Sequence, residues 1–237
     1  MRHGAVDVTQ AAMASPRTRY FAKKLFELTG FLPIGAFLIE HLYSNFQAVG
    51  PGGAQRFDNV VKDLQTNPII IFLEIGAIGL PLVYHAAYGL FVASQARPNV
   101  GSYGYGRNWL YLFQRITGVI LLFYIGYHVW NTRLAPLFHP DNPLLQNVDG
   151  QPLVSTAYMH NYLLETHLGI QVYWIYLVGV SCAVFHFSNG LWNVGYHWGL
   201  TVTPKSQRLW GYACGLIGVT LLAVALASLR AFINVSA

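Results

Sequence analysis

The sequence predicts an all-α membrane protein that crosses the bilayer five times. Of its 237 residues, 54% are hydrophobic and only 10% are charged, whereas about 25% of residues are charged in soluble globular proteins. A helix needs about 20 consecutive apolar residues to cross the hydrocarbon core. Several segments that are nearly free of Asp, Glu, Lys and Arg reach or approach that length, so lipid is the predicted environment of most of the chain.

Five apolar helices are expected, over residues 22–47, 68–96, 108–133, 168–198 and 207–233. Pro33 and Pro81 fall inside two of them and predict kinks, because proline removes a helical N–H donor. Residues 1–20 are expected to form a flexible tail. Residues 21–235 are then expected to form one five-helix domain.

The basic residues predict the orientation of the helices. With a cytoplasmic N-terminus, ten Lys and Arg residues lie inside and four lie outside, which are Arg56, Lys62, Arg133 and Arg230. This asymmetry satisfies the positive-inside rule, so the C-terminus and the long loop over residues 134–167 are expected outside. The net charge of +5 does not indicate a nucleic-acid partner, because the basic residues flank apolar segments and form no stripe.

Four of the nine histidines lie within the predicted membrane helices: His41, His85, His128 and His186. Each lies in the C-terminal half of its own helix, and successive helices run in opposite directions. His41 and His128 are therefore expected at one level near the outer face. His85 and His186 are expected together near the inner face.

This arrangement favours two haem sites. Neutral imidazole is a good iron ligand, and one histidine from each of two facing helices can hold a haem inside a bundle. When both axial positions are filled by protein, the chemistry left to the iron is electron transfer. A single histidine in a membrane helix is about as often merely hydrogen-bonded, so the prediction depends on all four together. His167, at the start of the fourth helix, is the main competing ligand.

The motifs around these histidines resemble those of a known family, the single-chain diheme cytochrome b subunit of bacterial succinate dehydrogenase, of the b558 type. The matching stretches are FLIEH ending at His41, LVYHAAYG around His85, QRITG from Gln114, YHVWNTR around His128, FHFSNGLW around His186 and TVTPKSQR ending at Arg208. Together they cover the chain from about Tyr20 through the fifth helix. His160, His167 and the long outer loop depart from the family pattern.

The resemblance implies two haems b, with the axial pairs His41/His128 and His85/His186. It also implies a place in the bacterial cytoplasmic membrane, as part of a complex with a flavoprotein subunit that oxidises succinate and an iron-sulfur subunit. These partners would dock on the inner face. A quinone, with menaquinone favoured, would be the substrate of the membrane subunit, and a higher oligomer of the complex stays open.

Two acidic residues in the apolar helices are candidates for proton exchange with the quinone, because a carboxyl group at this depth is costly unless it has a function. Glu74 lies near the start of the second helix, at the outer level, and is the preferred candidate for an outer menaquinone site. Glu40 is the competitor. A neutral or hydrogen-bonded structural role is equally expected for each of them.

Four further residues are candidates for contacts with the quinone or with haem propionates. Arg115 opens the third helix on the inner side within QRITG, which is similar to a motif near an inner quinone pocket in related anchor subunits. Plain anchoring by positive charge explains Arg115 equally well. Arg133 could bind a propionate outside. Ser188 and Asn189, which follow His186, could hydrogen-bond a propionate or a ligand.

Two other functions fit the sequence. The chain could be the cytochrome b subunit of a fumarate reductase or of another quinone-linked enzyme, because the direction of electron flow depends on potentials that the surroundings of the haem set. It could also be a haem-free transporter whose histidines and glutamates relay protons. The identity of the copurifying subunits would distinguish the first alternative from a succinate dehydrogenase. A haem absorbance spectrum would distinguish the second alternative from any cytochrome.

Overall fold

The computed structural model describes residues 15–234 and, within them, confirms the predicted fold class. This part of the chain is mostly helical. It contains five helical segments that are long and apolar enough to cross a membrane: Pro16–Phe46, Ile70–Ser94, Gly106–Phe138, Val172–His197 and Pro204–Ile233. These five spans correspond to the five predicted helices.

Several spans consist of more than one element. Up to residue 94 the elements are α1 (Pro16–Phe31), α2 (Pro33–Phe46), α3 (Gly53–Gln65), α4 (Ile70–Phe72), the π-helix η2 (Leu73–Gly79) and α5 (Leu80–Ser94). Beyond it they are α6 (Gly106–Val129), the π-helix η3 (Trp130–Leu134), α7 (Ala135–Phe138), β1 (Gln146–Val148), β2 (Gln151–Leu153), α8 (Thr156–Leu164), β3 (Thr166–His167), β4 (Ile170–Gln171), α9 (Val172–His197) and α10 (Pro204–Ile233).

The first span begins earlier than the sequence predicts. The Ser15 side chain accepts a hydrogen bond from the backbone N–H of Thr18, and Pro16 occupies the first helical position. Both features favour a helix start. Residues 16–20, assigned above to the tail, are therefore helical, and the rest of the predicted tail, residues 1–14, lies outside the described residues.

Prolines interrupt three spans. Leu32 separates α1 from α2, which begins at Pro33. The π-helix η2 ends just before Pro81, and η3 ends just before Pro136. A proline has no N–H to offer the carbonyl four residues earlier. The wider π-helical turn moves the bonding by one residue, so that the N–H of Leu80 bonds to the carbonyl of Ile75.

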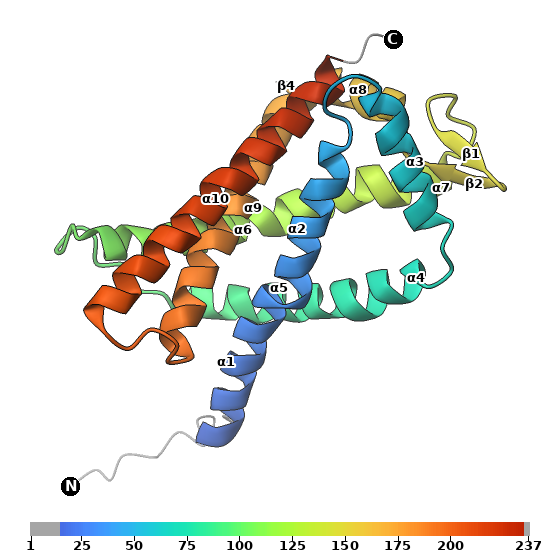
Figure 1. The fold of residues 1–237 in the computed structure, drawn as a ribbon. Coiled ribbons are helices and arrows are strands. Elements are labelled where there is room, and N and C mark those ends of the chain that lie inside the picture. The colour runs from blue at the N-terminus through green and yellow to red at the C-terminus, as the bar shows by residue number, and fades with distance from the viewer. Residues whose placement is uncertain (1–14, 235–237) are drawn as a thin grey trace, which may run out of the picture.

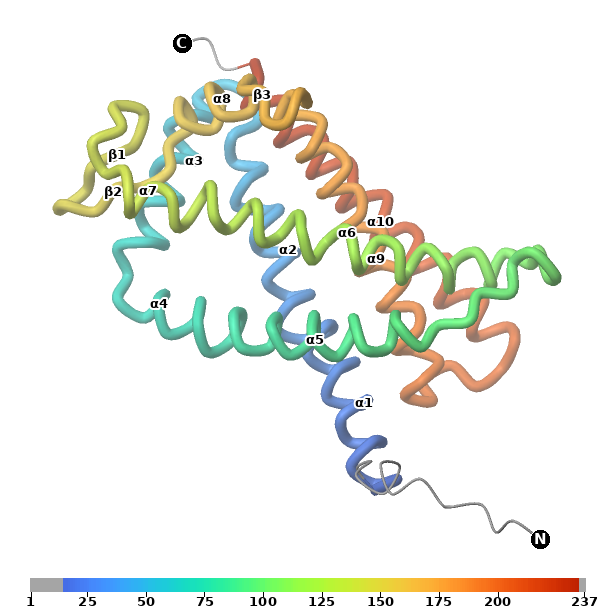
Figure 2. Tube along the Cα trace, turned by 180° about the vertical axis from the view of Figure 1, so that it is seen from behind, coloured from blue at the N-terminus to red at the C-terminus, as the bar shows by residue number. Residues whose placement is uncertain are grey.

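Helix α9 lies at the centre of the packing, in extensive contact with both α6 and α10. Helix α2 packs on α10, whereas α5 contacts mainly α1. Figures 1 and 2 show α5 and α6 as two separate rods that run along the same side of the molecule. Side chains from α1, α2, α5, α6 and α9 line a cavity that lies among these helices.

The two ends of the bundle differ. At one end, here named the capped end, α3, α7, α8 and the strands β1 and β2 gather at the upper right of Figure 1. The other end, here named the loop end, holds, among the described residues, the start of α1 and the connections over residues 95–105 and 198–203. The main buried cluster, which includes Phe57, Leu163 and Val172, lies at the capped end.

The capped end also contains the one departure from the all-α prediction among the described residues, two short antiparallel pairs, β1–β2 and β3–β4. Asp149 and Gly150 join β1 to β2 with φ angles of 51° and 82°. An Asp-Gly pair with both φ angles positive is the usual two-residue hairpin turn. Helix α8, from Thr156 to Leu164, lies within the segment that the sequence predicts as a long loop.

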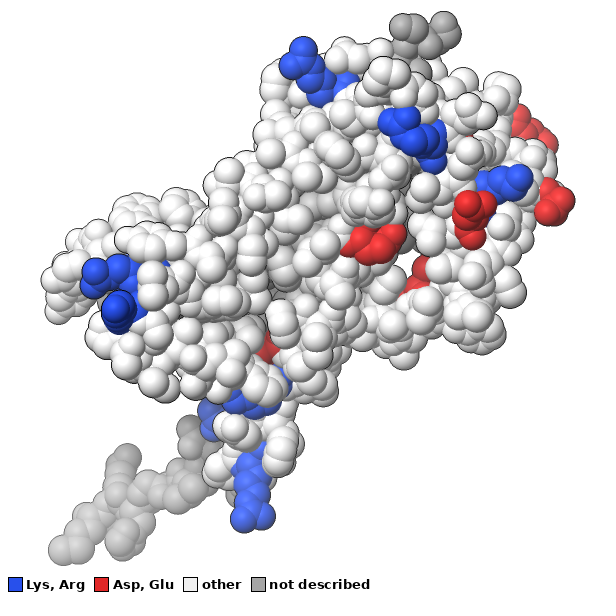
Figure 3. Space-filling model, viewed as in Figure 1, with Lys and Arg blue, Asp and Glu red and all other residues white. Residues whose placement is uncertain are grey.

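Charged side chains gather toward the two ends of the molecule. On the face drawn in Figure 3, Lys and Arg lie at the loop end and along the edge of the capped end, where most of the acidic groups also lie. Most of the face between them carries neither. This distribution fits a protein whose middle lies in lipid.

Asp58 of α3 fastens the cap to α8, and its removal should loosen the capped end. Its Oδ1 accepts hydrogen bonds from the backbone N–H and from the hydroxyl of Thr156, both at 2.7 Å. We expect Asp58→Ala to cost about 1.5–3 kcal/mol, because these bonds involve a charged acceptor. Thermal unfolding and protease cleavage within residues 139–155 would measure the loss.

Asp63→Ala is the matched control, because Asp63 lies on the exposed face of the same helix. Cleavage that is equally fast in both variants would show that Asp58 does not hold the cap.

Candidate functional site

One large cavity contains all four histidines singled out in the sequence. Its volume is about 2030 Å³, and His41, His85, His128 and His186 all lie in its lining. Ligand pockets commonly measure about 300–1,000 Å³. The cavity is therefore large enough for more than one cofactor-sized molecule.

The histidines meet in two pairs, each formed from two different spans. His41 of α2 and His128 of α6 have ring centroids 5.7 Å apart, toward the capped end. His85 of α5 and His186 of α9 have ring centroids 6.3 Å apart, toward the loop end. In each pair the rings are steeply inclined to one another, at 75° and 83°.

These separations suit two imidazoles that share one metal ion. A coordinated imidazole nitrogen lies about 2 Å from its metal, and the ring centroid lies roughly 1 Å behind that nitrogen. The centroids of two imidazoles that bind one metal from opposite sides are therefore about 6 Å apart. Among the described residues, no group of three or more His, Cys, Asp or Glu side chains could hold a metal ion. A haem needs no such group, because the porphyrin supplies the other four nitrogens.

In the pair at the loop end, hydrogen bonds fix which nitrogen is free. The Nδ1 of His85 lies 3.0 Å from the carbonyl of Phe26 and must donate to it. The Nδ1 of His186 lies 3.2 Å from the hydroxyl of Thr117, which itself donates to the Phe113 carbonyl at 2.7 Å. His186 is therefore the donor in this contact. Both rings keep Nε2 available, in the way that ligating histidines are usually oriented.

In the pair at the capped end, His128 is held by its own neighbours. Its Nδ1 lies 3.0 Å from the hydroxyl of Tyr176, and the ring of Tyr124 stacks on it with centroids 5.9 Å apart. The hydroxyl of Thr132 donates to the carbonyl of His128 at 2.8 Å. The ring and the backbone of this residue are thus both constrained.

His41 is held by contacts within its own helix. The ring of Phe37 stacks against it at 5.3 Å, and the Asn45 amide donates to its backbone carbonyl at 2.7 Å. Glu40 also lines the cavity, where its carboxylate accepts a hydrogen bond from Ser44. This hydrogen bond to a residue one turn away in the same helix fits the structural role that was considered above for Glu40.

Two glycines allow the loop-end pair to sit close to the neighbouring helices. A Cβ atom on Gly30 would lie 2.5 Å from Cε1 of His85, and one on Gly118 would lie 3.0 Å from Cε1 of His186. Sequence reasoning missed Gly30. It singled out QRITG for Arg115, yet Gln114, Thr117 and Gly118 are the members of that motif that contact His186.

Glu74 and Arg133 lie together at the capped end of the cavity. Their ion pair has an N–O distance of 2.8 Å, and a second hydrogen bond to the same oxygen measures 3.2 Å. Gln65 of α3 accepts a third bond from Arg133, at 2.6 Å. Glu74 lies in η2 and Arg133 in η3, so the two π-helical segments carry the two charges. Such segments are frequent at functional sites.

Arg115 lines the cavity near its loop end. Its Nη1 donates to the Tyr111 carbonyl at 2.8 Å, and its guanidinium carbon lies 3.3 Å from the centroid of the Tyr111 ring. Its buried Nε has no hydrogen-bond partner among the described residues. The guanidinium therefore keeps a donor available.

The two residues after His186 behave differently. Asn189 is buried and donates to the Gln114 side chain at 2.7 Å, and Gln114 in turn donates to the carbonyl of His186 at 3.1 Å. Ser188 does not line the cavity. Its hydroxyl donates to the Val184 carbonyl at 2.6 Å and lies against Gly218 of α10. Because Ser188 points to the other side of α9, it is removed from the predicted site.

His167 lies outside the lining of the cavity. Its Nδ1 is 2.7 Å from the hydroxyl of Tyr127, and its Nε2 is 3.0 Å from the carboxylate of Glu165. The ring of Tyr162 lies next to it. Burial raises the pKa of Tyr162 far above the ordinary value for tyrosine. With both ring nitrogens engaged, His167 belongs to a polar cluster of the cap.

Comparison with known proteins gives one informative match. The chain is 39% identical, over 223 residues, to the succinate dehydrogenase cytochrome b558 subunit of Bacillus subtilis (strain 168). The match covers 93% of this chain and 100% of that protein. No protein-family model matches the chain.

Gly30 offers a test of the packing around His85 that needs no cofactor. Gly30→Ala should displace the His85 ring from its bond to Phe26 and cost about 1–3 kcal/mol, the usual cost of overpacking. Thermal unfolding in detergent would measure the loss.

Gly215→Ala is the control, because nothing lies within 4 Å of a Cβ at that exposed position of α10. A Gly30→Ala protein that is as stable as the control would contradict the close approach of α1 to His85.

Proposed function

The chain belongs to the family of succinate dehydrogenase cytochrome b558 subunits and is a multi-pass protein of the bacterial cytoplasmic membrane, and we propose that it transfers electrons between an iron-sulfur partner subunit and a quinone with the help of two haems b. One observation carries this proposal. Two pairs of imidazoles, at two levels of one cavity, have the separation that two ligands of one iron require.

The proposed ligands are His41 with His128 at the capped end and His85 with His186 at the loop end. A haem b with two imidazole ligands supplies one-electron transfer. The protein's part is to present Nε2 of each ring to the cavity and to hold the other nitrogen. The Phe26 carbonyl and the Thr117 hydroxyl do this for the second pair.

We propose that the loop end faces the cytoplasm. Lys23, Arg97, Arg107 and Arg115 line the cavity there, and the positive-inside rule favours this orientation. The iron-sulfur subunit, which itself docks with the flavoprotein that oxidises succinate, would then approach the His85–His186 pair. Arg115, with a donor to spare, would bind an anionic or carbonyl group at this end, such as a haem propionate or a quinone.

The quinone site is proposed at the capped end, with menaquinone as the favoured substrate. Quinone reduction takes up protons as well as electrons, so the site needs an ionisable group that is held in place. Glu74 meets this need, because Arg133 fixes its carboxylate at the wall of the cavity. While paired in this way, Arg133 has less capacity to bind a haem propionate.

Asn189 is proposed to position α6 through Gln114.

Four single substitutions test the axial pairs. His85→Ala and His186→Ala should each remove the same haem, whereas His41→Ala and His128→Ala should each remove the other, because each haem would lose one of the two imidazoles that hold it. Reduced-minus-oxidised absorbance spectra and the ratio of haem to protein measure the losses.

His167→Ala is the control and should leave both haems in place. A purified wild-type complex without haem would contradict the proposal and favour the proton-relaying transporter. Loss of the same haem in both His41→Ala and His85→Ala would contradict the pairing.

Glu74→Gln tests the quinone site. The amide has nearly the same shape as the carboxylate but cannot exchange a proton, so succinate-driven quinone reduction should slow by about a hundredfold. The spectra of both haems should remain unchanged, because Glu74 touches neither histidine pair.

Glu40→Gln is the comparison variant, since Glu40 lines the same cavity but is bonded to Ser44. Unchanged turnover in Glu74→Gln would remove Glu74 from the site, and slow turnover in Glu40→Gln alone would move the proton-exchanging role to Glu40.

A further inference from the structure

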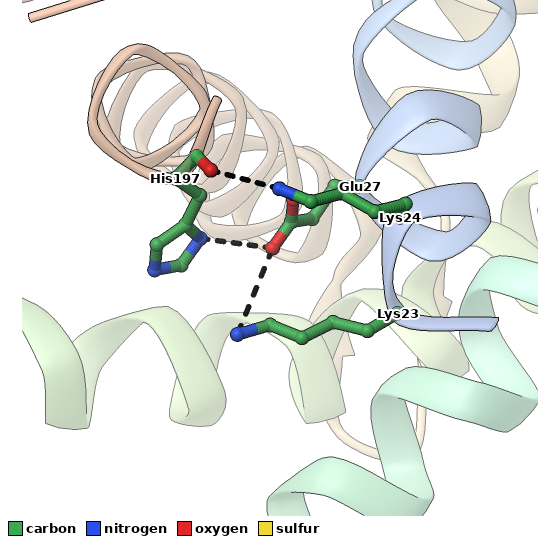
Figure 4. Close-up of polar contacts among 4 residues, drawn as sticks. All are labelled: Lys23, Lys24, Glu27 and His197. Atoms are coloured by element: carbon green, nitrogen blue, oxygen red, sulfur yellow. Dashed lines mark hydrogen bonds and ion pairs between the residues drawn. The ribbon is translucent and has the colours of Figure 1, made fainter. Parts of the chain in front are cut away.

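A second charged cluster lies at the loop end, and it consists of residues that the sequence did not single out. Glu27 of α1 has a side chain that is only 7% exposed, and its Oε1 lies 2.9 Å from Nδ1 of His197, the last residue of α9. Figure 4 shows the carboxylate of Glu27 between His197 and the side chains of Lys23 and Lys24. These contacts join α1, in the first span, to the end of α9, which is the fourth span.

Lys24 makes the second connection between the same two helices. Its Nζ donates to the backbone carbonyl of His197 at 2.8 Å and to the carboxylate of Glu27 at 3.3 Å. The ammonium group also lies 4.9 Å from the ring centroid of Trp198. Lys24 therefore binds both the carboxylate and the C-terminal carbonyl of α9, where the helix dipole favours a cation.

The turn of α1 that carries Glu27 also shapes the surroundings of His85. Phe26 accepts the hydrogen bond of the His85 Nδ1 and stacks on its ring, with centroids 4.4 Å apart and planes 16° apart. Gly30 leaves the space that the ring occupies. The orientation of His85 in α5 is thus set from a neighbouring helix, by residues on either side of Glu27.

Helix α1 packs on α2, α5 and α9, yet large apolar side chains near its start stay exposed. Tyr20, Phe21 and Leu25 are exposed by 58%, 67% and 49%. Above them, Leu32 separates α1 from α2. A further hydrogen bond, from the Tyr84 hydroxyl to the Ala22 carbonyl at 2.8 Å, joins α5 to α1 and does not involve α9.

We propose that Glu27, Lys24 and His197 act as positioning residues for the His85–His186 pair, and we name these three residues the α1–α9 clamp. Helix α9 carries His186, and α1 holds His85, so fastening α1 to α9 fixes one imidazole relative to the other. This inference rests on the proposed function of the pair as ligands of one haem.

The burial of Glu27 gives the clamp its strength, because this side chain is 7% exposed whereas those of Lys24 and His197 are 20% and 36% exposed. Exposed ion pairs contribute little, because water competes for both charges. A buried carboxylate must keep its partners, since the loss of one leaves a charge without compensation. Lys23 differs from the clamp residues, because it is 56% exposed and its Nζ lies 4.0 Å from Glu27.

The test compares Glu27→Gln, His197→Ala and Lys23→Gln in the purified complex. Electron paramagnetic resonance distinguishes two bis-histidine haems by the angle and strain of their ligands, without any turnover. In Glu27→Gln and His197→Ala we expect the signal of the His85–His186 haem to shift and that haem to dissociate in detergent about tenfold faster or more. The signal of the other haem should stay unchanged.

Two variants separate positioning from general destabilisation. His197→Gln keeps a side-chain N–H that can donate to Glu27, so its spectrum should lie closer to that of the wild type than the spectrum of His197→Ala does. Lys23→Gln removes a charge from the same cluster without touching α9, and both signals should remain as in the wild type.

The clamp is overturned if the His85–His186 signal is unchanged in both Glu27→Gln and His197→Ala, or if both haem signals change equally. A complex in which Glu27→Gln does not assemble leaves His197→Ala to decide, because His197 lies at a half-exposed helix end. A wild-type complex that lacks two bis-histidine signals would instead overturn the proposed function, so the two failures are distinguishable.

Discussion

The structure depends on polar imidazoles that meet in pairs inside a bundle surrounded by lipid. A polar ring in such a place needs partners for both nitrogens. His85 and His186 use a backbone carbonyl and a threonine hydroxyl for Nδ1, and both residues line the cavity. The helices around them must therefore keep fixed positions, and glycines at two contacts allow the approach.

Irregular helix geometry contributes to the site at the capped end. The prolines that follow η2 and η3 remove hydrogen bonds from the spans, and the wider turns that result carry Glu74 and Arg133. At the start of η3 the Tyr127 carbonyl accepts hydrogen bonds from the backbone N–H of Trp130 and from the Asn131 amide. The same feature that weakens the two helices thus brings a carboxylate and a guanidinium together at the wall of the cavity.

The two ends are held by different means. At the capped end, α3, α8 and the hairpin form a packed cluster with a hydrophobic core, so the His41–His128 pair lies beneath an ordered lid of protein. The loop end has no comparable cover among the described residues, and polar contacts between helix ends take its place. The α1–α9 clamp fits this division, because an end without such a cover can be rigid only through contacts between its own helices.

The sequence by itself determined the five spans, since their length and lack of charge are local properties, and it determined the levels of the four histidines, since alternating direction follows from the number of crossings. It could not determine rotation about each helix axis. For this reason the sequence could not predict that Ser188 faces α10 and not the cavity. Contacts such as Lys24 with His197, 173 residues apart, arise only when helices pack, because hydropathy records how deep a residue lies and not which neighbour it meets.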